Sequence, residues 1–474
     1  MTTASPRRAL VPVLIFIGTV VAVISSLGAP LIPAIAETMG TSLPDAQWAL
    51  TVTLLVGAVA TPVVGRLGDG RHRRAVILGV LAVVTVGGAL AALPLGLGWL
   101  VAGRGLQGFG LGLTPLAIAT AREALHGRRA VSTIAALSVT VVAGVGLGYP
   151  LAGLVAELGG VHAAFLAGAL VSCAALVAAA VVLPPAPQAP PRRLDVLGAL
   201  LLGAALAALL LALGNAETWG PASPLLWALL GGAALLLAAW AVWEHRTPWP
   251  LVDLRLARGR LALSAHSAAL LVGLGNYLLL ASVPVLAQAP RPGGFDASIV
   301  VAGLVLLPFS AASVLGGRLA RALAARAGAS AVLPVAALVQ ASAFLLFGLT
   351  RSDLWQLFLV MAVAGLGVGA AFAAFPGLIV AAVPPSETGS AMSLNQVLRY
   401  VGFAVGSALA ATVLAAATPD GASAPGAGGY AVLAVVGGAV CVATAALTWL
   451  VTSAAPTGRP VAPAAVSGTV DAGR

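Results

Sequence analysis

The stretch GRLGDGRHRR, residues 65–74, decides the fold. It places four arginines, one acid and three glycines in ten positions, between two long apolar runs. Such a cluster of charge is too costly to lie inside a hydrocarbon core, whereas the runs on either side of it could lie there. We therefore interpret the stretch as a short polar connection between two membrane-spanning segments.

The composition of the whole chain indicates that a bilayer is its main solvent. Of the 474 residues, 60% are hydrophobic and 8% are charged, whereas soluble domains carry about 25% charged residues. Apolar runs of about 20 residues recur along the chain, and a helix of that length crosses a hydrocarbon core about 30 Å thick. Because apolar and polar residues do not alternate, we predict an all-α polytopic membrane protein and not a barrel of strands.

The distribution of basic residues predicts an even number of spans with both termini in the cytoplasm. With this topology 20 of the 24 arginines lie on cytoplasmic segments, while the 14 acids divide equally between the two sides. A bias of the bases alone is the positive-inside pattern. Counting apolar runs gives fourteen spans, at residues 10–34, 47–66, 75–94, 99–121, 131–156, 162–183, 195–213, 223–243, 261–288, 298–319, 331–350, 354–383, 391–417 and 430–453.

Two parts of the chain repeat one pattern in the same orientation. GRLARALAARAG begins at Gly317, after span 10, as GRLGDGRHRR does after span 2, although it has no acid at the place of Asp69. Two halves related by an axis along the membrane normal would give this repeat. We expect an N-terminal six-helix bundle at 1–183, a proline-rich linker with two extra spans and a cytoplasmic surface segment at 184–260, a C-terminal six-helix bundle at 261–453, and a disordered cytoplasmic tail at 454–474.

Three groups of residues resemble motifs of one family. In the loop between spans 2 and 3 they are Gly65, Gly68, Asp69, Arg71, Arg73 and Arg74. In LVAGRGLQGFGLG of span 4 they are Arg104, Gln107 and Gly108. In AGVGLGYPLAG of span 5 they are Gly144, Gly148, Pro150 and Gly153, with Tyr149 before the proline. The chain thus resembles the major facilitator superfamily and, within it, the fourteen-span drug:proton antiporters of the multidrug efflux type. In that family the bent fifth span is tied to antiport.

Asp69 is the loop residue with the most specific chemistry. Its carboxylate can accept hydrogen bonds from arginines and from the positive N-terminus of a helix. The resemblance implies that this helix is span 13, which opens with PPSETG at 384–389, so that the contact would hold the halves together when the cytoplasmic side is closed. The alternative is a solvated turn whose arginines only set topology. The expected members of this latch are Gly65, Gly68, Asp69, Arg71, Arg73, Arg74, Glu387 and Arg399.

Two arginines lie within predicted spans, where an ionised group indicates function by default. Arg104 lies about a turn and a half inside span 4 and could bind carbonyls of span 1 that are freed where Gly28, Ala29 and Pro30 interrupt that helix. An arginine that only pins span 4 to span 1 is the alternative. Arg399 has Asn395 one turn earlier on its face, and we expect a structural or latch role for it.

No acid lies deep in any predicted span. The fourteen-span drug exporters usually carry an acid in span 1, and our alignment places Ile24 at that position. A buried carboxylate is the simplest group to exchange a proton for a lipophilic cation. Two interpretations therefore stay open: either Glu37 takes the proton role, facing Arg104 with Gln107 nearby, or the cargo is neutral or anionic.

The residues that could line a cavity are polar and aromatic side chains on spans 1, 4, 9 and 12. Each of them alone is more commonly a packing residue than a ligand of the cargo. They are Ser25, Ser26, Thr114, His266, Asn276, Tyr277, Phe372 and Phe375.

No chemistry typical of soluble enzymes competes with transport. The five histidines show no paired metal spacing, the two cysteines lie far apart, and no serine nucleophile or phosphate-binding motif is present. We expect no enzyme activity, no metal, no cofactor and no nucleic acid. The preferred function is proton-coupled efflux of lipophilic small molecules by alternating access, by a monomer in the cell membrane. A uniporter or importer of a neutral or anionic solute, and a non-transporting membrane sensor or scaffold, are the alternatives.

Overall fold

The computed structural model describes residues 6–27, 31–185, 194–220, 222–419 and 425–453. Within these ranges the secondary structure is helical, without strands. The predicted interruption at residues 28–30 and the predicted disordered tail at 454–474 lie outside the described residues. The all-α fold class is thereby confirmed for the part of the chain that the structure describes.

The first half of the chain forms helices that begin and end close to the predicted spans. α7 is broken at Gly160, whose φ of 80° and ψ of 175° only glycine adopts readily, so that predicted spans 5 and 6 follow one another without a loop. The elements are α1 (Pro6–Ser26), α2 (Ile32–Met39), α3 (Leu43–Gly68), α4 (Arg73–Ala92), α5 (Leu97–Gly108), the 3-10 turn η2 (Phe109–Gly112), α6 (Leu113–Ala124) and α7 (Gly127–Val182).

The second half contains three long unbroken apolar helices. α12, α16 and α17 have 29 residues each. The elements are α8 (Val196–Gly214), α9 (Ala216–Trp219), α10 (Pro224–Arg246), α11 (Leu254–Ala257), α12 (Arg260–Gln288), α13 (Ile299–Leu304), α14 (Leu307–Ala327), η3 (Ala329–Ala331), α15 (Val332–Leu349), α16 (Leu354–Ala382), η4 (Pro385–Glu387), α17 (Thr388–Ala416) and α18 (Ala427–Ser453).

Eleven helices in the described part are long and apolar enough to cross a membrane. A shorter apolar segment, 9–24, belongs to α1. Predicted span 4 is divided by η2 into two helices of 12 residues each, and predicted spans 5 and 6 are both part of α7. The structure therefore shows a polytopic helical protein with eleven candidate spans, and the number fourteen stays a prediction.

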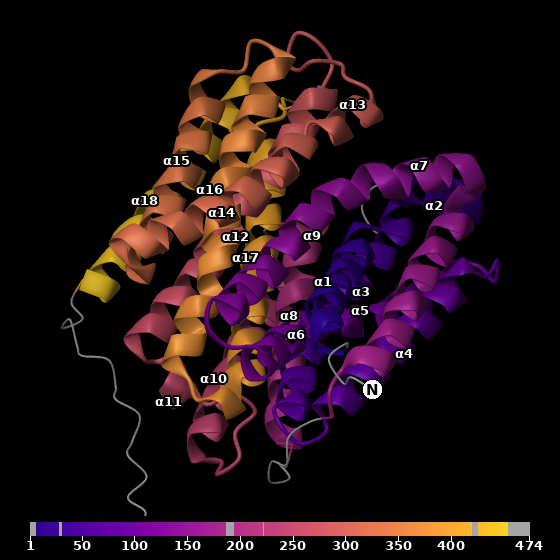
Figure 1. Cartoon of the computed structure of the whole chain (residues 1–474). Helices are drawn as coiled ribbons and strands as arrows, with labels where there is room; N and C mark the ends of the chain where they lie inside the picture. The colour runs from indigo at the N-terminus through magenta and orange to yellow at the C-terminus, as the bar shows by residue number, and fades with distance from the viewer. Residues whose placement is uncertain (1–5, 28–30, 186–193, 221, 420–424, 454–474) are drawn as a thin grey trace, which may run out of the picture.

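The helices pack in two groups that lie side by side (Figure 1). In one group α1 and α4 pack on α7, and α5 packs on α3 and α4. In the other, α12 packs on α17, and α15 packs on α16 and α18. Contacts between the groups run from α3 to α17 and from α7 to α14 and α16. α8 and α10 pack on each other, and α8 also contacts α3 and α17, so the added helices lie at the junction of the groups.

Candidate functional site

The carboxylate of Asp69 lies against the first turn of α17. Asp69 directly follows α3 and is 3% exposed. Its Oδ1 accepts a hydrogen bond from the backbone N–H of Gly389 at 2.6 Å, and its Oδ2 accepts one from the backbone N–H of Ser390 at 2.8 Å. The first N–H groups of a helix have no partner within the helix and carry partial positive charge, so a carboxylate satisfies them. The contact between Asp69 and the helix that follows PPSETG is therefore present.

The same burial changes the acidity of this carboxyl. Burial raises the pKa of Asp69 to about 6, the hydrogen bonds from Ser390 and Gly389 act in the opposite direction, and the nearby charge of Glu387 adds to the rise. Asp69 therefore exchanges its proton closer to neutral pH than an exposed aspartate does.

Glycine permits the close approach of α3 and α17 at this place. A Cβ atom on Gly389 would lie 2.6 Å from Asp69 Oδ1 and 2.8 Å from the carbonyl oxygen of Gly65. A Cβ atom on Gly65 would overlap the hydroxyl of Ser393, and one on Gly68 would overlap the side chain of Leu116. A larger residue at Gly389 would thus push the two helices apart and break the bonds to Asp69.

An ion pair beside Asp69 joins the same two helices. Arg66 Nη1 lies 2.9 Å from Glu387 Oε2, with both side chains largely buried. Glu387 was predicted here, whereas Arg66 was not, because its place in the loop motif gave no sign that it points toward span 13. Buried pairs of this kind lose much stability when one partner is removed, since the other charge stays buried alone.

Arg122 supplies a third connection that the sequence did not indicate. It lies in α6 and donates to the hydroxyl of Thr388 at 2.5 Å. It also donates to the carbonyl oxygens of Val380 at 2.7 Å and Val383 at 2.9 Å, where α16 ends. A cation is favoured at a helix C-terminus. We use the name latch for the contacts of Arg66, Asp69 and Arg122 with residues 387–390.

The other loop arginines hold the loop to its own group of helices. Arg73 pairs with Glu123 of α6, and Arg74 donates to the carbonyl oxygen of Ala180 at 2.6 Å, near the end of α7. Arg71 is exposed. The prediction that Arg71, Arg73 and Arg74 belong to the latch is therefore wrong, because their guanidinium groups are turned away from α17 or satisfied locally.

Arg399 lies too far along α17 to join the latch. It is eleven residues beyond Thr388, which is about 16 Å along a helix. Its guanidinium carbon lies 4.4 Å from the centroid of the Phe372 ring of α16, a cation–π contact. Asn395 donates to the carbonyl oxygen of Ala265 in α12 at 2.9 Å and so belongs to helix packing. The latch role predicted for Arg399 is wrong, and its structural role is supported.

Arg104 is fully buried and connects three helices. Its Nε donates to the carbonyl oxygen of Ala49 in α3 at 3.0 Å, and its Nη1 donates to the carbonyl oxygen of Ile24 in α1 at 3.1 Å. Nη1 also donates to Gln107 Oε1 at 2.8 Å. The predicted bond to a span 1 carbonyl is confirmed, at Ile24. A planar group with five donors suits this junction of backbone oxygens.

Glu37 does not face Arg104. Glu37 is exposed near the end of α2, and within the described ranges the ion pairs of the structure do not include Arg104. The predicted pairing of these two residues is wrong, because the Nε and Nη1 of Arg104 donate to backbone oxygens and to Gln107 in the interior while Glu37 lies exposed. A proton role for Glu37 would have to be exercised without Arg104.

Of the four residues of the predicted bent helix, Gly144 lies where α7 closely approaches another helix. A Cβ atom there would overlap the Cβ of Ala22, so Gly144 brings α7 against α1. The space around a Cβ on Gly153 is open. Gly148 and Pro150 lie outside the residues whose side chains are described.

A cavity of about 210 Å³ lies between α3, α8, α12 and α17. Tyr277 of α12, Tyr400 and Phe403 of α17 form its aromatic lining, and the first half of α3 contributes residues 47–55. The latch joins α3 and α17 near Asp69 and Gly389, at the opposite ends of the same helices. α3 and α17 therefore touch at one end and enclose a cavity at the other.

The remaining predicted cavity residues do not line this space. Thr114, Asn276 and His266 are buried elsewhere, and Phe372 and Phe375 pack on each other with ring centroids 5.6 Å apart. The prediction of one cavity lined by all these residues is wrong: among those described, Tyr277 lines the cavity between α3, α8, α12 and α17, and His266 lines a separate small cavity. The side chains of Ser25 and Ser26 lie outside the described part.

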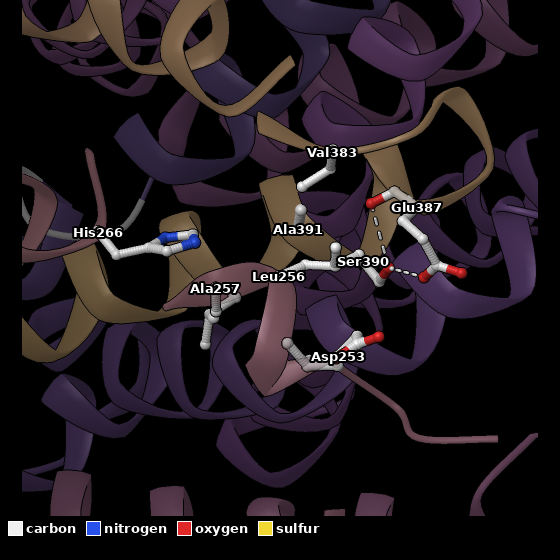
Figure 2. Close-up of a pocket in the computed structure, with 10 residues that line it drawn as sticks. Asp253, Leu256, Ala257, His266, Val383, Glu387, Ser390 and Ala391 are labelled. Carbon is white, nitrogen blue, oxygen red and sulfur yellow. Dashed lines mark hydrogen bonds between the residues drawn. The ribbon is translucent and has the colours of Figure 1, made fainter. Parts of the chain in front are cut away.

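The segment after α10 lies against the latch. Asp253 and Leu256, in or next to α11, share a cavity of about 10 Å³ with His266, Glu387 and Ser390 (Figure 2). A space of this size holds about one water molecule. In Figure 2 the hydroxyl of Ser390 bonds to the backbone oxygen and carboxylate of Glu387. The linker thus covers the side of the latch that faces α12.

A buried carboxylate fixes the part of the linker that follows α10, residues 247–259. Glu244, 4% exposed near the end of α10, accepts hydrogen bonds from the backbone N–H groups of Leu251 at 3.0 Å and Val252 at 3.3 Å. Leu251 and Val252 are buried, whereas Trp249 is half exposed. The segment predicted to lie on the membrane surface is therefore anchored into the protein at its centre.

The sequence and the arrangement of helices have counterparts among known proteins. The profile of the Major Facilitator Superfamily matches residues 14–242 and 265–469. The chain belongs to the major facilitator superfamily. This membership makes the protein a multi-pass membrane transporter and not an enzyme.

Several relatives carry names that refer to export or resistance. The chain is 27% identical over 387 residues to the multidrug resistance protein B homolog of Mycobacterium tuberculosis, covering 79% of this chain and 70% of the relative. It is 29% identical over 406 residues to the tetracenomycin C resistance and export protein of Streptomyces glaucescens, covering 82% and 72%. The crystal structure of the human organic anion transporter MFSD10 (TETRAN) is similar with a TM-score of 0.65 at 19% identity, covering 94% of this chain and 99% of that one, which shows the fold alone.

Proposed function

We propose that this protein is a secondary active transporter that exports lipophilic small molecules in exchange for protons, by alternating access. The observation that carries the proposal is the Asp69 contact with Gly389 and Ser390, which closes one end of α3 and α17 while a cavity lies between their other ends. With the latch at the cytoplasmic face, as the arginine distribution predicts, this is the state closed to the cytoplasm. Opening the latch would expose the cargo path to the inside.

The proposed architecture has fourteen spans and both termini in the cytoplasm of a cell membrane protein that acts as a monomer. Its two bundles are residues 1–183 and 261–453, which rock against each other, and residues 184–260 join them. Support comes from the two groups of helices and from the added pair α8 and α10 at their junction. Three proposed spans are not among the eleven helices identified by length: span 1 lies in the shorter apolar segment 9–24, span 4 is divided by the turn η2, and span 5 runs into span 6 at Gly160.

Export of lipophilic compounds is supported by the names of two relatives, which refer to multidrug resistance and to antibiotic export. A proton gradient is the proposed energy source, because the sequence has no phosphate-binding loop. Asp69, whose pKa burial raises to about 6, is a group at the latch that can exchange a proton near neutral pH. A uniporter or importer of a neutral or anionic solute is the second candidate, favoured by the burial of Arg104 and Arg399 without acidic partners among the described residues.

The test uses proteoliposomes that contain the full chain, with a pH gradient imposed across their membrane. We expect a lipophilic fluorescent dye to accumulate on the exoplasmic side only while the gradient lasts. Asp69→Asn should reduce this transport roughly tenfold, because an amide offers one acceptor to two N–H donors. The matched control is Asp296→Asn, at an exposed position whose φ of 52° asparagine tolerates. Transport that ignores the gradient would remove proton coupling, and undiminished transport by Asp69→Asn would remove the latch role.

A further inference from the structure

We propose that the cavity between α3, α8, α12 and α17 is a binding site for uncharged aromatic small molecules, and that the added helix α8 forms one of its walls. The cavity has a volume of about 210 Å³. The proposal rests on the proposed function, for which it names the class of cargo and the place where the cargo binds.

An aromatic cluster lines one side of the cavity. The rings of Tyr277 and Phe403 are stacked, with centroids 4.8 Å apart and an interplanar angle of 30°. The ring of Tyr400 is tilted at 59° to that of Phe403, with centroids 6.1 Å apart. Offset stacking and edge contacts with such rings favour flat aromatic ligands beyond their buried area. Because Tyr277 comes from α12 and the others from α17, the cluster spans two helices that pack on each other.

A few polar groups are placed among the apolar walls. Gln47 and Thr51 of α3 and Ser407 of α17 line the cavity, and Tyr400 receives a hydrogen bond from Gln396 at 2.8 Å through its hydroxyl oxygen. A mostly apolar lining with a small number of polar side chains is typical of small-molecule sites, in which the polar groups set orientation. The lining therefore matches a ligand with one or two neutral polar substituents.

The charges around the cavity favour an uncharged ligand. The described residues that line it contain no acid and no base. Arg399, next to Tyr400 in sequence, is buried, and no acid is paired with it in the part of the chain that the structure describes. A lipophilic cation would meet no carboxylate here and would be repelled by Arg399 across a medium of low dielectric constant. An anion would lose its hydration among described lining residues that offer it no basic side chain, since Arg399 itself is not part of the lining.

α8 encloses the cavity on the side between the two bundles. Leu210, Leu213 and Gly214, at the end of α8, line it together with Leu50 of α3 and Ala411 of α17. α8 packs on both α3 and α17. Since α3 and α17 belong to different groups of helices, a movement that separates them would change the shape of the site. The added helix thereby gives the site a wall of protein where lipid would otherwise lie.

The experiment measures binding to the full chain in lipid nanodiscs, with empty nanodiscs as the blank. The probes are uncharged N-phenyl-1-naphthylamine, cationic tetraphenylphosphonium and anionic 8-anilinonaphthalene-1-sulfonate. We expect saturable binding of the uncharged probe and at least tenfold weaker binding of both ions. Gly214→Trp, which would fill the cavity from α8, should weaken binding of the uncharged probe at least tenfold. Gly231→Trp, on an exposed face of α10, is the matched control and should bind as the parent does.

A second pair of variants separates loss of the site from loss of folding. Phe403→Ala should weaken binding of the uncharged probe about tenfold, whereas Phe403→Tyr, which keeps the ring, should restore it. The proposal is overturned if either ion binds as tightly as the uncharged probe, if Gly214→Trp behaves as Gly231→Trp does, or if Phe403→Ala binds normally. Gradient-driven export with normal affinity in Gly214→Trp would refute this site and leave the proposed function intact. Specific binding without transport would refute the function and leave the site intact.

Discussion

The two ends of the α3–α17 pair are built from opposite kinds of residue. At the latch end the helices touch through Gly65 and Gly389, and buried charged groups pair or form hydrogen bonds between them. At the other end Tyr400 and Phe403 line a cavity without charged residues. Buried charged groups between closely packed glycines give a contact that forms or breaks as a unit. Aromatic rings that line a cavity can instead pack against ligands of different shapes. Closure and recognition are thus separated along one pair of helices.

The largest effect on transport is expected at Gly389, where α3 and α17 pack closely at the latch. Gly389→Ala should reduce transport roughly tenfold or more, because the added Cβ would lie within 3.0 Å of Asp69 Oδ1 and of the Gly65 oxygen. Gly79→Ala, at an exposed site with open space in α4, should transport normally. The measurement is initial rate of dye transport per reconstituted protein. Normal rates in Gly389→Ala would show that close contact at this end is not needed.

The next comparison concerns the two interior arginines. Arg104→Ala should lower the free energy of unfolding by about 3 kcal/mol, since it removes two hydrogen bonds that join α5 to α3 and α1 and a third to Gln107 within α5. Arg399→Ala should lower it by about 1 kcal/mol, because it removes a contact with the Phe372 ring. Thermal unfolding of both variants in detergent gives the ranking. Equal or reversed shifts would contradict the roles assigned to these two residues.

A smaller effect is expected from the linker that covers the latch. Glu244→Gln should release residues 247–259 in part, because an amide has one acceptor oxygen for the N–H groups of Leu251 and Val252. The expected destabilisation is about 1 kcal/mol, measured as faster amide hydrogen exchange in this segment. Glu157→Gln, an exposed glutamate, is the control. Unchanged exchange would mean that Glu244 does not hold the linker.

The smallest effect concerns pH. Burial raises the pKa of Asp69 to about 6 from its ordinary 3.8, so the latched state takes up a proton more readily than a state in which the carboxyl returns to water. By linkage, the latched state should gain stability as the pH falls through 6 toward 3.8. Glu387, paired with Arg66, and Arg122 are charged groups beside Asp69 or the first turn of α17, and Asp253 and His266 share a small cavity with Ser390.

The measurement for this prediction is thiol labelling of Ser393→Cys, a buried position at the contact with Gly65. Between pH 7 and pH 5 its labelling should slow roughly threefold, relative to the exposed native Cys173 at each pH. The same measurement with Asp69→Asn should show no such change. A pH response that survives Asp69→Asn must come from another group.

Sequence could predict the parts of the fold and site that depend on local pattern. Runs of apolar residues predicted the helices, and the resemblance to the major facilitator superfamily implied the contact of Asp69 with the helix that opens at PPSETG, across 320 positions. Arg66 and Arg122 could not be assigned in the same way, since their partners depend on how two helices face each other. Glu37 was wrongly paired with Arg104 because both lie near the same end of their spans, while Arg104 donates hydrogen bonds to the interior oxygens of Ala49 and Ile24 instead.

The anchoring of the linker by Glu244 also limits how far the two bundles can travel. Val252 is fixed to α10, and α12 begins at Arg260. Eight residue steps of fully extended chain reach at most about 28 Å. These eight steps therefore tether the start of α12 to the end of α10. The covalent chain alone limits how far α12 can move away from α10, whatever side-chain contacts form or break.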